Sequence, residues 1–289
     1  MWKKLSSIVL IGLALLTACR KDEKVATPTK GTFTLTLQAT KRMDTKALNL
    51  SNDGKTLSGG WKSGETVSIL ADGNVIIGTL TAQETGRTTT LSGTVSKDDL
   101  TENMKLYLLL PSEEWYYTHQ KGSFETVSDF DFATATVTVD TIEGESVTLS
   151  TASIEFQSEQ SIYRFGFSMG DEALKVKEVI IDSENGKLVK GRVFDSQWIS
   201  RYFEDTFLSV TPGVATAEPL YVALRNDYTA TKESYYFLVV NDDNDLYEGV
   251  LESKAPLANG HFYEATLDVN RTYLNSYSQI KESDPNNII

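Results

Sequence analysis

The stretch Thr32–Gln38 reads Thr-Phe-Thr-Leu-Thr-Leu-Gln, in which polar and apolar residues alternate without interruption. Successive side chains of a β-strand point to opposite faces of the sheet, so Phe33, Leu35 and Leu37 would share one face. Strict alternation over this length is typical of a strand with one buried face. The stretch therefore predicts a β-strand near the start of a sheet-rich chain.

Similar patterns recur along the rest of the chain and are separated by turn-forming residues. The further predicted strands cover 67–70, 75–80, 88–95, 106–110, 134–139, 146–150, 162–167, 176–182, 191–194, 220–224, 235–240, 247–251 and 262–269. Short helices are predicted only near 98–103 and 197–204. Short strands with turn signals at regular intervals predict an all-β fold made of β-sandwiches.

The number of predicted strands suggests two sandwiches in series. We expect an N-terminal β-sandwich over 31–152 and a C-terminal β-sandwich over 153–270, followed by a C-terminal tail over 271–289. No Pro/Gly-rich linker marks the boundary, and the two halves show no exact repeat.

The N-terminus has the pattern of a bacterial lipoprotein signal peptide. Lys3 and Lys4 form a basic end, and the apolar run 8–16 is too short to span a bilayer as a helix. The sequence Leu16-Thr17-Ala18-Cys19 resembles a lipobox, and Cys19 is the single cysteine of the chain. We therefore predict lipid attachment at Cys19; the alternative is a plain signal peptide with an incidental cysteine.

Residues 1–18 would be removed as the signal peptide. Residues 19–30 have almost no apolar content and are predicted to form a flexible tether. Within the tether, Lys21-Asp22-Glu23 resembles the export signal of surface lipoproteins in gut and oral anaerobes. The alternative is that these three residues belong to an ordinary charged linker. The expected location is the outer membrane, held by lipid and facing outward.

The chain is acidic, with 27 Lys and Arg against 40 Asp and Glu and a formal net charge of −13. Loss of Lys3 and Lys4 with the signal peptide makes the mature chain more negative still. Neither nucleic acid nor an anionic lipid surface would be attracted to such a field. We therefore expect no nucleic-acid partner.

Motifs that indicate catalysis are missing from the sequence. The acids at Glu113, Glu114, Asp129 and Asp131 could be imagined as a carboxylate pair for glycoside hydrolysis, but we expect solvated loop acids. No enzyme activity, cofactor or metal is predicted. The acidic segment 241–245 faintly resembles a calcium loop but lacks its glycine, so we predict a polar hairpin tip there.

Two aromatic clusters leave a choice between packing and binding. The run Trp115-Tyr116-Tyr117 could stack on a sugar, and so could Trp198, Tyr202 and Phe203. Packing in a core or an interface is the alternative use of the same side chains.

Several short segments, in this order, resemble fimbrillin-like proteins, the subunits of type V pili. The segments are Thr45-Lys46-Ala47, Leu57-Ser58, Trp61-x-x-Gly64-Glu65-x-Val67, Leu91-Ser92-Gly93, 107–111 (YLLLP), 179–191 (VIIDSENGKLVKG), 221–224 (YVAL) and 260–263 (GHFY). This resemblance covers roughly residues 31–270. It implies two transthyretin-like β-sandwiches in a surface lipoprotein that assembles into adhesive filaments.

The resemblance also implies a mode of assembly. In polymerising fimbrillins a protease removes the first strand after a basic residue, and a strand from a neighbouring subunit fills the groove. Here the removable strand would carry Phe33, Leu35 and Leu37, and the cut would follow Arg42 or Lys46. Many relatives carry arginine where this chain has Lys46. The alternative is that these basic residues, together with Lys41, lie on an exposed loop that is not cut.

The sequence therefore favours a fimbrial subunit or fimbrillin-like adhesin, whose partners are other fimbrial subunits and a surface receptor or glycan. The alternative is a glycan-binding outer-membrane lipoprotein of a polysaccharide-uptake system. The donor strand stays open, because the polar segment 272–289 does not alternate cleanly.

Overall fold

The computed structural model describes residues 31–41, 51–52, 55–56, 60–71, 75–183, 188–195, 199–205, 207–226 and 232–272. Cys19, Arg42, Lys46, Trp198 and the tail 273–289 lie outside these residues. The regular structure is almost entirely β, which confirms the predicted all-β fold. The two short 3-10 helices within the described ranges, η2 (Lys97–Asp99) and η3 (Val127–Phe130), are too short to span a membrane.

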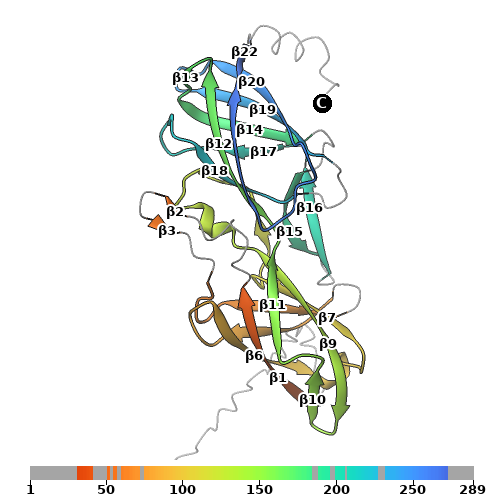
Figure 1. The fold of residues 1–289 in the computed structure, drawn as a ribbon. Coiled ribbons are helices and arrows are strands. Elements are labelled where there is room, and N and C mark those ends of the chain that lie inside the picture. Colours follow the sequence, from red (N-terminus) through yellow and green to blue (C-terminus); the bar gives the residue numbers. More distant parts are fainter. Residues whose placement is uncertain are drawn as a thin grey trace, which may run out of the picture.

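The first half of the chain forms one sheet that closes on itself. Its strands are β1 (Thr32–Lys41), β4 (Thr66–Leu70), β5 (Ile76–Ala82), β6 (Thr88–Ser96), β7 (Lys105–Leu110), β9 (Ala133–Glu143), β10 (Ser146–Leu149) and β11 (Ser153–Ser158). They pair in the order β10-β9-β11-β1-β6-β5-β4-β7, and β7 pairs again with β9. This last pairing wraps the sheet around a single apolar core (Figure 1). A small hairpin, β2 (Ser51–Asn52) with β3 (Lys55–Thr56), lies outside the sheet.

The second half contains two sheets that face each other. One contains β12 (Ser161–Met169), β13 (Glu172–Ala173), β18 (Leu220–Leu224) and β21 (Phe262–Asp268). The other contains β17 (Phe207–Val210), β14 (Val176–Ser183), β19 (Ser234–Asn241), β20 (Leu246–Glu252) and β22 (Asn270–Thr272), in this order. A third, smaller sheet joins β16 (Ser200–Asp205), β15 (Leu188–Phe194) and β8 (Trp115–Tyr116).

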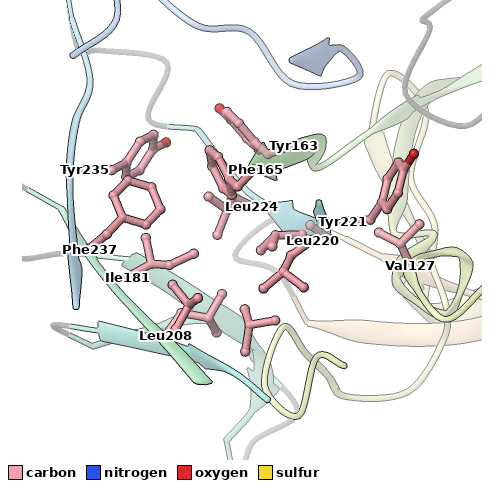
Figure 2. Packing of buried hydrophobic residues seen from close by; sticks show 14 of the residues in the cluster. Val127, Tyr163, Phe165, Ile181, Leu208, Leu220, Tyr221, Leu224, Tyr235 and Phe237 are labelled. Atoms are coloured by element: carbon pink, nitrogen blue, oxygen red, sulfur yellow. The ribbon is translucent and has the colours of Figure 1, made fainter. Parts of the chain in front are cut away.

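Aromatic side chains from β12 and β19 hold the two larger sheets together. The rings of Phe165 and Phe237 meet edge to face with centroids 5.0 Å apart, and those of Tyr163 and Tyr235 do so at 6.0 Å. Figure 2 shows these rings above the aliphatic side chains of β14 and β17, including Ile181. All five side chains are almost fully buried, so the sandwich is stabilised by a buried layer of aromatic and aliphatic side chains.

Strand pairing continues the first sheet beyond the expected boundary at residue 152. Strand β11 pairs in parallel with β1 and antiparallel with β9, so 153–158 belong to the first sheet. We therefore propose a boundary at 159–160. Conversely, residues of 115–132 pack in the core of the second half, and β8 pairs with β15. The halves are interlocked by this segment as well as joined in series.

A buried polar cluster fixes the junction between the halves. Glu159, between β11 and β12, accepts hydrogen bonds from Thr134 Oγ1 at 2.7 Å and Tyr202 Oη at 2.6 Å, and pairs with Arg225 Nε at 3.1 Å. Burial opposes the carboxylate, but these hydrogen bonds and the arginine charge lower the pKa of Glu159 overall. Burial and the nearby carboxylate raise the pKa of Tyr202 to about 12, so this hydroxyl remains a donor.

The prediction of a short helix over 197–204 is wrong for the described part of that segment. Residues 200–205 form strand β16, which pairs with β15 from Phe194↔Ser200 to Leu188↔Asp205. Pairing with β15 on one side stabilises the strand conformation of 200–205. Such tertiary pairing overrides weak local propensity.

Candidate functional site

The first strand, β1, buries alternate side chains as its sequence predicts. The inward side chains are between 0% and 3% exposed; they are Phe33, Leu35, Leu37 and Ala39. The alternate side chains face solvent; they are Thr32, Thr34, Thr36 and Gln38. Every second residue of the strand therefore places an apolar side chain in the core of the closed sheet. The prediction that Phe33, Leu35 and Leu37 share a buried face is confirmed.

Strand β1 lies between two neighbours and is not an edge strand. It pairs antiparallel with β6 over its length, from Thr32↔Ser96 to Thr40↔Thr88. On its other side, 38–41 pair in parallel with 153–156 of β11. The first strand of the described chain thus closes a gap between two strands that come much later in the sequence, as Figure 1 shows.

A buried lysine ends β1. Lys41 is 4% exposed, and its Nζ lies 2.9 Å from Asp131 Oδ2, 3.1 Å from Glu65 Oε2 and 3.3 Å from the carbonyl oxygen of Gly60. The same Nζ lies 4.8 Å from the ring centroid of Trp61. We call Gly60, Trp61, Glu65 and Asp131 the lysine pocket. Its three oxygens match the three donors of an ammonium group.

Asp131 is not the solvated loop acid that the sequence suggested. It lies just after η3, and its side chain is 20% exposed. Burial raises the pKa of this carboxyl group, and the charge of Lys41 opposes the shift. Asp129 is exposed, as expected, and so are Glu113 and Glu114. Asp131 pairs with the lysine that ends β1.

Lys41 does not lie on an exposed loop, which was the alternative considered for the basic residues after β1. The alternation of the strand could have revealed that Lys41 is buried, because Lys41 lies two residues after Ala39 and four after Leu37, on the same inward face. Arg42 and Lys46, the predicted cut sites, follow immediately in a segment outside the described residues. A protease could reach Lys41 only after its side chain left the pocket.

The aromatic run on β8 serves packing. Trp115 is 5% exposed and stacks on Phe132, with centroids 4.1 Å apart and an interplanar angle of 18°. Tyr117 is fully buried, and Tyr202 meets the Trp115 ring edge-on at 6.5 Å. Tyr116 is exposed, and its hydroxyl donates to Glu114. Of the two uses open to Trp115, the structure shows core packing.

The segment 241–245 forms the turn between β19 and β20, as predicted. Asn244 has a positive φ of 67°, and the Asn241 side-chain oxygen accepts from the backbone N–H of Asp245 at 2.8 Å. Asp242 pairs with Lys175 at 3.6 Å, and Asp245 pairs with Arg271. Within the described ranges, no three His, Cys, Asp or Glu side chains are placed to hold a metal ion.

An open cavity of about 640 Å³ lies on the second half, beside Arg164 of β12 and the start of β18. Basic and aromatic side chains in its lining include Lys121, Phe124, Arg164 and Tyr221. Phe124 and Tyr221 meet edge to face at 5.2 Å, and Arg164 pairs with Glu264 at 3.1 Å. This cavity was not predicted, because its lining comes from loops that are distant in sequence.

No family model matches the chain, and no curated protein is similar to it in sequence. Among solved structures, a candidate cell adhesion protein from Bacteroides ovatus is 12% identical with a TM-score of 0.42, and the match covers 82% of this chain and 95% of that one. A fimbrial assembly protein from Parabacteroides distasonis is 10% identical with a TM-score of 0.34, covering 82% and 90%. Values this low assign no function to this chain.

Proposed function

We propose that this chain is a surface lipoprotein of the fimbrillin type, which joins other subunits by strand exchange after loss of β1. The position of β1 carries the proposal. It precedes every other described strand, it is central in the first sheet, and the predicted cut sites Arg42 and Lys46 follow it directly.

Removal of β1 would leave a groove with two complementary properties. The facing edges of β6 and β11 would expose backbone groups that now pair with β1. Between them, the space now filled by Phe33, Leu35 and Leu37 would open to solvent. An extended strand from another subunit would restore the backbone ladder and fill these positions with alternate apolar side chains.

The order of features along the chain links assembly to anchoring. Cys19 precedes β1, so a cut after Arg42 or Lys46 would release the lipid together with the strand. An uncut chain would stay on the outer membrane as an anchored adhesin, whereas a cut chain would enter a filament. The lipid would then serve export, and proteolysis would decide the final location.

Mild trypsin treatment of the purified mature protein tests this proposal. We expect a cut after Arg42 or Lys46, followed by ladders on denaturing gels of unheated samples when other subunits are present. A variant with Arg42→Gln and Lys46→Gln is the matched control and should show no cut at these two positions. Protein that is trimmed but remains monomeric with every candidate subunit would overturn strand exchange.

Glycan binding is retained as a second candidate because of the cavity beside Lys121 and Tyr221. The exposed Lys121 and the partly exposed Arg164 in its lining could hydrogen-bond a short saccharide. The aromatic side chains of Trp115, Phe124 and Tyr221 are each less than 10% exposed and could not stack on one. A glycan array with a Lys121→Ala control would test this. A signal that is the same in the variant, or absent in both proteins, would remove the candidate.

A further inference from the structure

The lysine pocket is the second part of the site that holds β1. Beyond the apolar positions of Phe33, Leu35, Leu37 and Ala39, the strand ends in a cation that two carboxylates and a carbonyl group surround. The two carboxylate side chains, Glu65 and Asp131, are 25% and 20% exposed. Any strand that replaced β1 would have to supply a group that compensates these two negative charges.

An apolar residue at the place of Lys41 would leave both carboxylates without their shared cation. Breaking a buried ion pair from one side is strongly destabilising, because the remaining charge stays desolvated. The Lys62 N–H still donates to Glu65 Oε2 at 3.0 Å, but Asp131 Oδ2 would lose the ammonium group that lies 2.9 Å from it. The ring of Trp61 would also lose the cation that lies 4.8 Å from its centroid.

We infer that the lysine pocket selects the incoming strand: the partner is a β-strand of a different subunit, with alternating apolar residues followed by a lysine at the place of Lys41. This inference rests on the proposed strand exchange and names its partner. Read in the direction of β1, the inward positions of the partner strand carry three large apolar side chains and then a small one. The lysine follows at the next inward position.

The chain's own tail does not fit this pattern. Lys281 is the single basic residue of 273–289, and the side chains in phase with it are Tyr273, Asn275, Tyr277 and Gln279. Placed in the groove, Asn275 would occupy the position of Leu35 and Gln279 that of Ala39, which are buried among apolar groups. Burying such amides without partners is unfavourable. The tail is therefore a poor occupant, which favours a strand from a subunit of different sequence.

The test uses the mature chain after trypsin has cut it after Arg42 or Lys46, with the β1 segment still held in place. Release of this segment is followed while a labelled synthetic peptide of residues 31–42 is added in excess. Matched peptides carry Lys41→Met or Lys41→Arg, and matched chains carry Asp131→Asn or, as the exposed control, Asp129→Asn.

We expect the wild-type peptide to exchange into the groove and the Lys41→Met peptide to bind at least 10-fold more weakly. The Lys41→Arg peptide should recover part of this loss. On the Asp131→Asn chain the preference for lysine should shrink several-fold, whereas the Asp129→Asn chain should behave like wild type.

Equal binding of the wild-type and Lys41→Met peptides would overturn the selection by the pocket while leaving strand exchange intact. A preference for lysine that is unchanged on the Asp131→Asn chain would overturn it as well. If trypsin does not cut, or if no peptide enters the groove, the proposed function itself fails, and this inference falls with it. Binding of a synthetic 273–289 peptide as tight as that of the 31–42 peptide would refute the assignment to a different subunit.

Discussion

Lys41 Nζ lies 2.9 Å from Asp131 Oδ2, although ninety residues separate them in the sequence. The contact joins the end of the first strand to the loop that leads into β9. Because β9 closes the sheet by pairing with β7, this ion pair ties β1 to the strand that completes the ring. Three interactions thus hold the first strand in place: backbone hydrogen bonds to β6 and β11, a buried apolar face, and the ion pairs of Lys41 at its end.

Leu35→Ala should destabilise the first half by about 3 kcal/mol, because it removes a fully packed side chain and leaves a cavity. Leu35 is 2% exposed in the centre of β1. Urea unfolding followed by tryptophan fluorescence measures the loss. Thr34→Val, on the exposed face of the same strand, should change stability by less than about 0.5 kcal/mol. Equal effects of the two substitutions would contradict the observed facing of β1.

Glu159→Gln should cost about 3 kcal/mol near neutral pH, because it leaves the buried Arg225 without its anion. The folded-state pKa of Glu159 is below the ordinary value of 4.5, so its contribution is complete above that pH and disappears as the pH falls through the folded-state pKa. The difference in unfolding free energy from wild type should therefore shrink below about pH 4.5.

Urea unfolding at a series of pH values measures this difference. Glu155→Gln, an exposed acid on β11, is the matched control and should show little effect at any pH. A loss in the Glu159→Gln variant that stays constant down to pH 3 would show that the charge of Glu159 does not stabilise the junction.

Trp115→Ala should destabilise the protein by about 3–5 kcal/mol, because the ring is buried against Phe132. Chemical unfolding and the near-ultraviolet circular dichroism signal report the change. Tyr116→Ala, at the exposed neighbour, should cost less than about 1 kcal/mol. A stable Trp115→Ala protein that lost a glycan signal would contradict the packing role.

Gly93→Ala should disrupt the pairing of β5 with β6. A Cβ atom at Gly93 would lie 2.1 Å from the carbonyl oxygen of Thr79 and 3.1 Å from Leu80 Cα, so two backbones would have to separate. We expect a loss of more than about 2 kcal/mol, seen as a lower midpoint of thermal unfolding. Gly213→Ala, where a Cβ meets nothing within 4 Å, is the control. Wild-type stability of the Gly93→Ala variant would show that the sheet yields at this point.

Local pattern was enough to predict most strands, and the hairpin tip at 241–245, because alternation and turn chemistry act over a few neighbouring residues. The predicted segment 220–224 matches β18 at both ends. The pattern failed at 197–204, whose described part is β16, because its partner strand decides its structure. The pairing of β8 with β15 was equally invisible, since it joins residues more than seventy positions apart.

By itself, the sequence determined the all-β fold and the inward face of β1, because both depend on the order of nearby residues; lipid attachment at Cys19 stays a prediction. The tertiary structure alone decided that β1 is central, that Trp115 packs in a core and that Lys41 is neutralised by Glu65 and Asp131. These facts depend on contacts between segments that are distant in sequence. Whether a charge or an aromatic ring is buried, and against which neighbours, is set only by the folded chain.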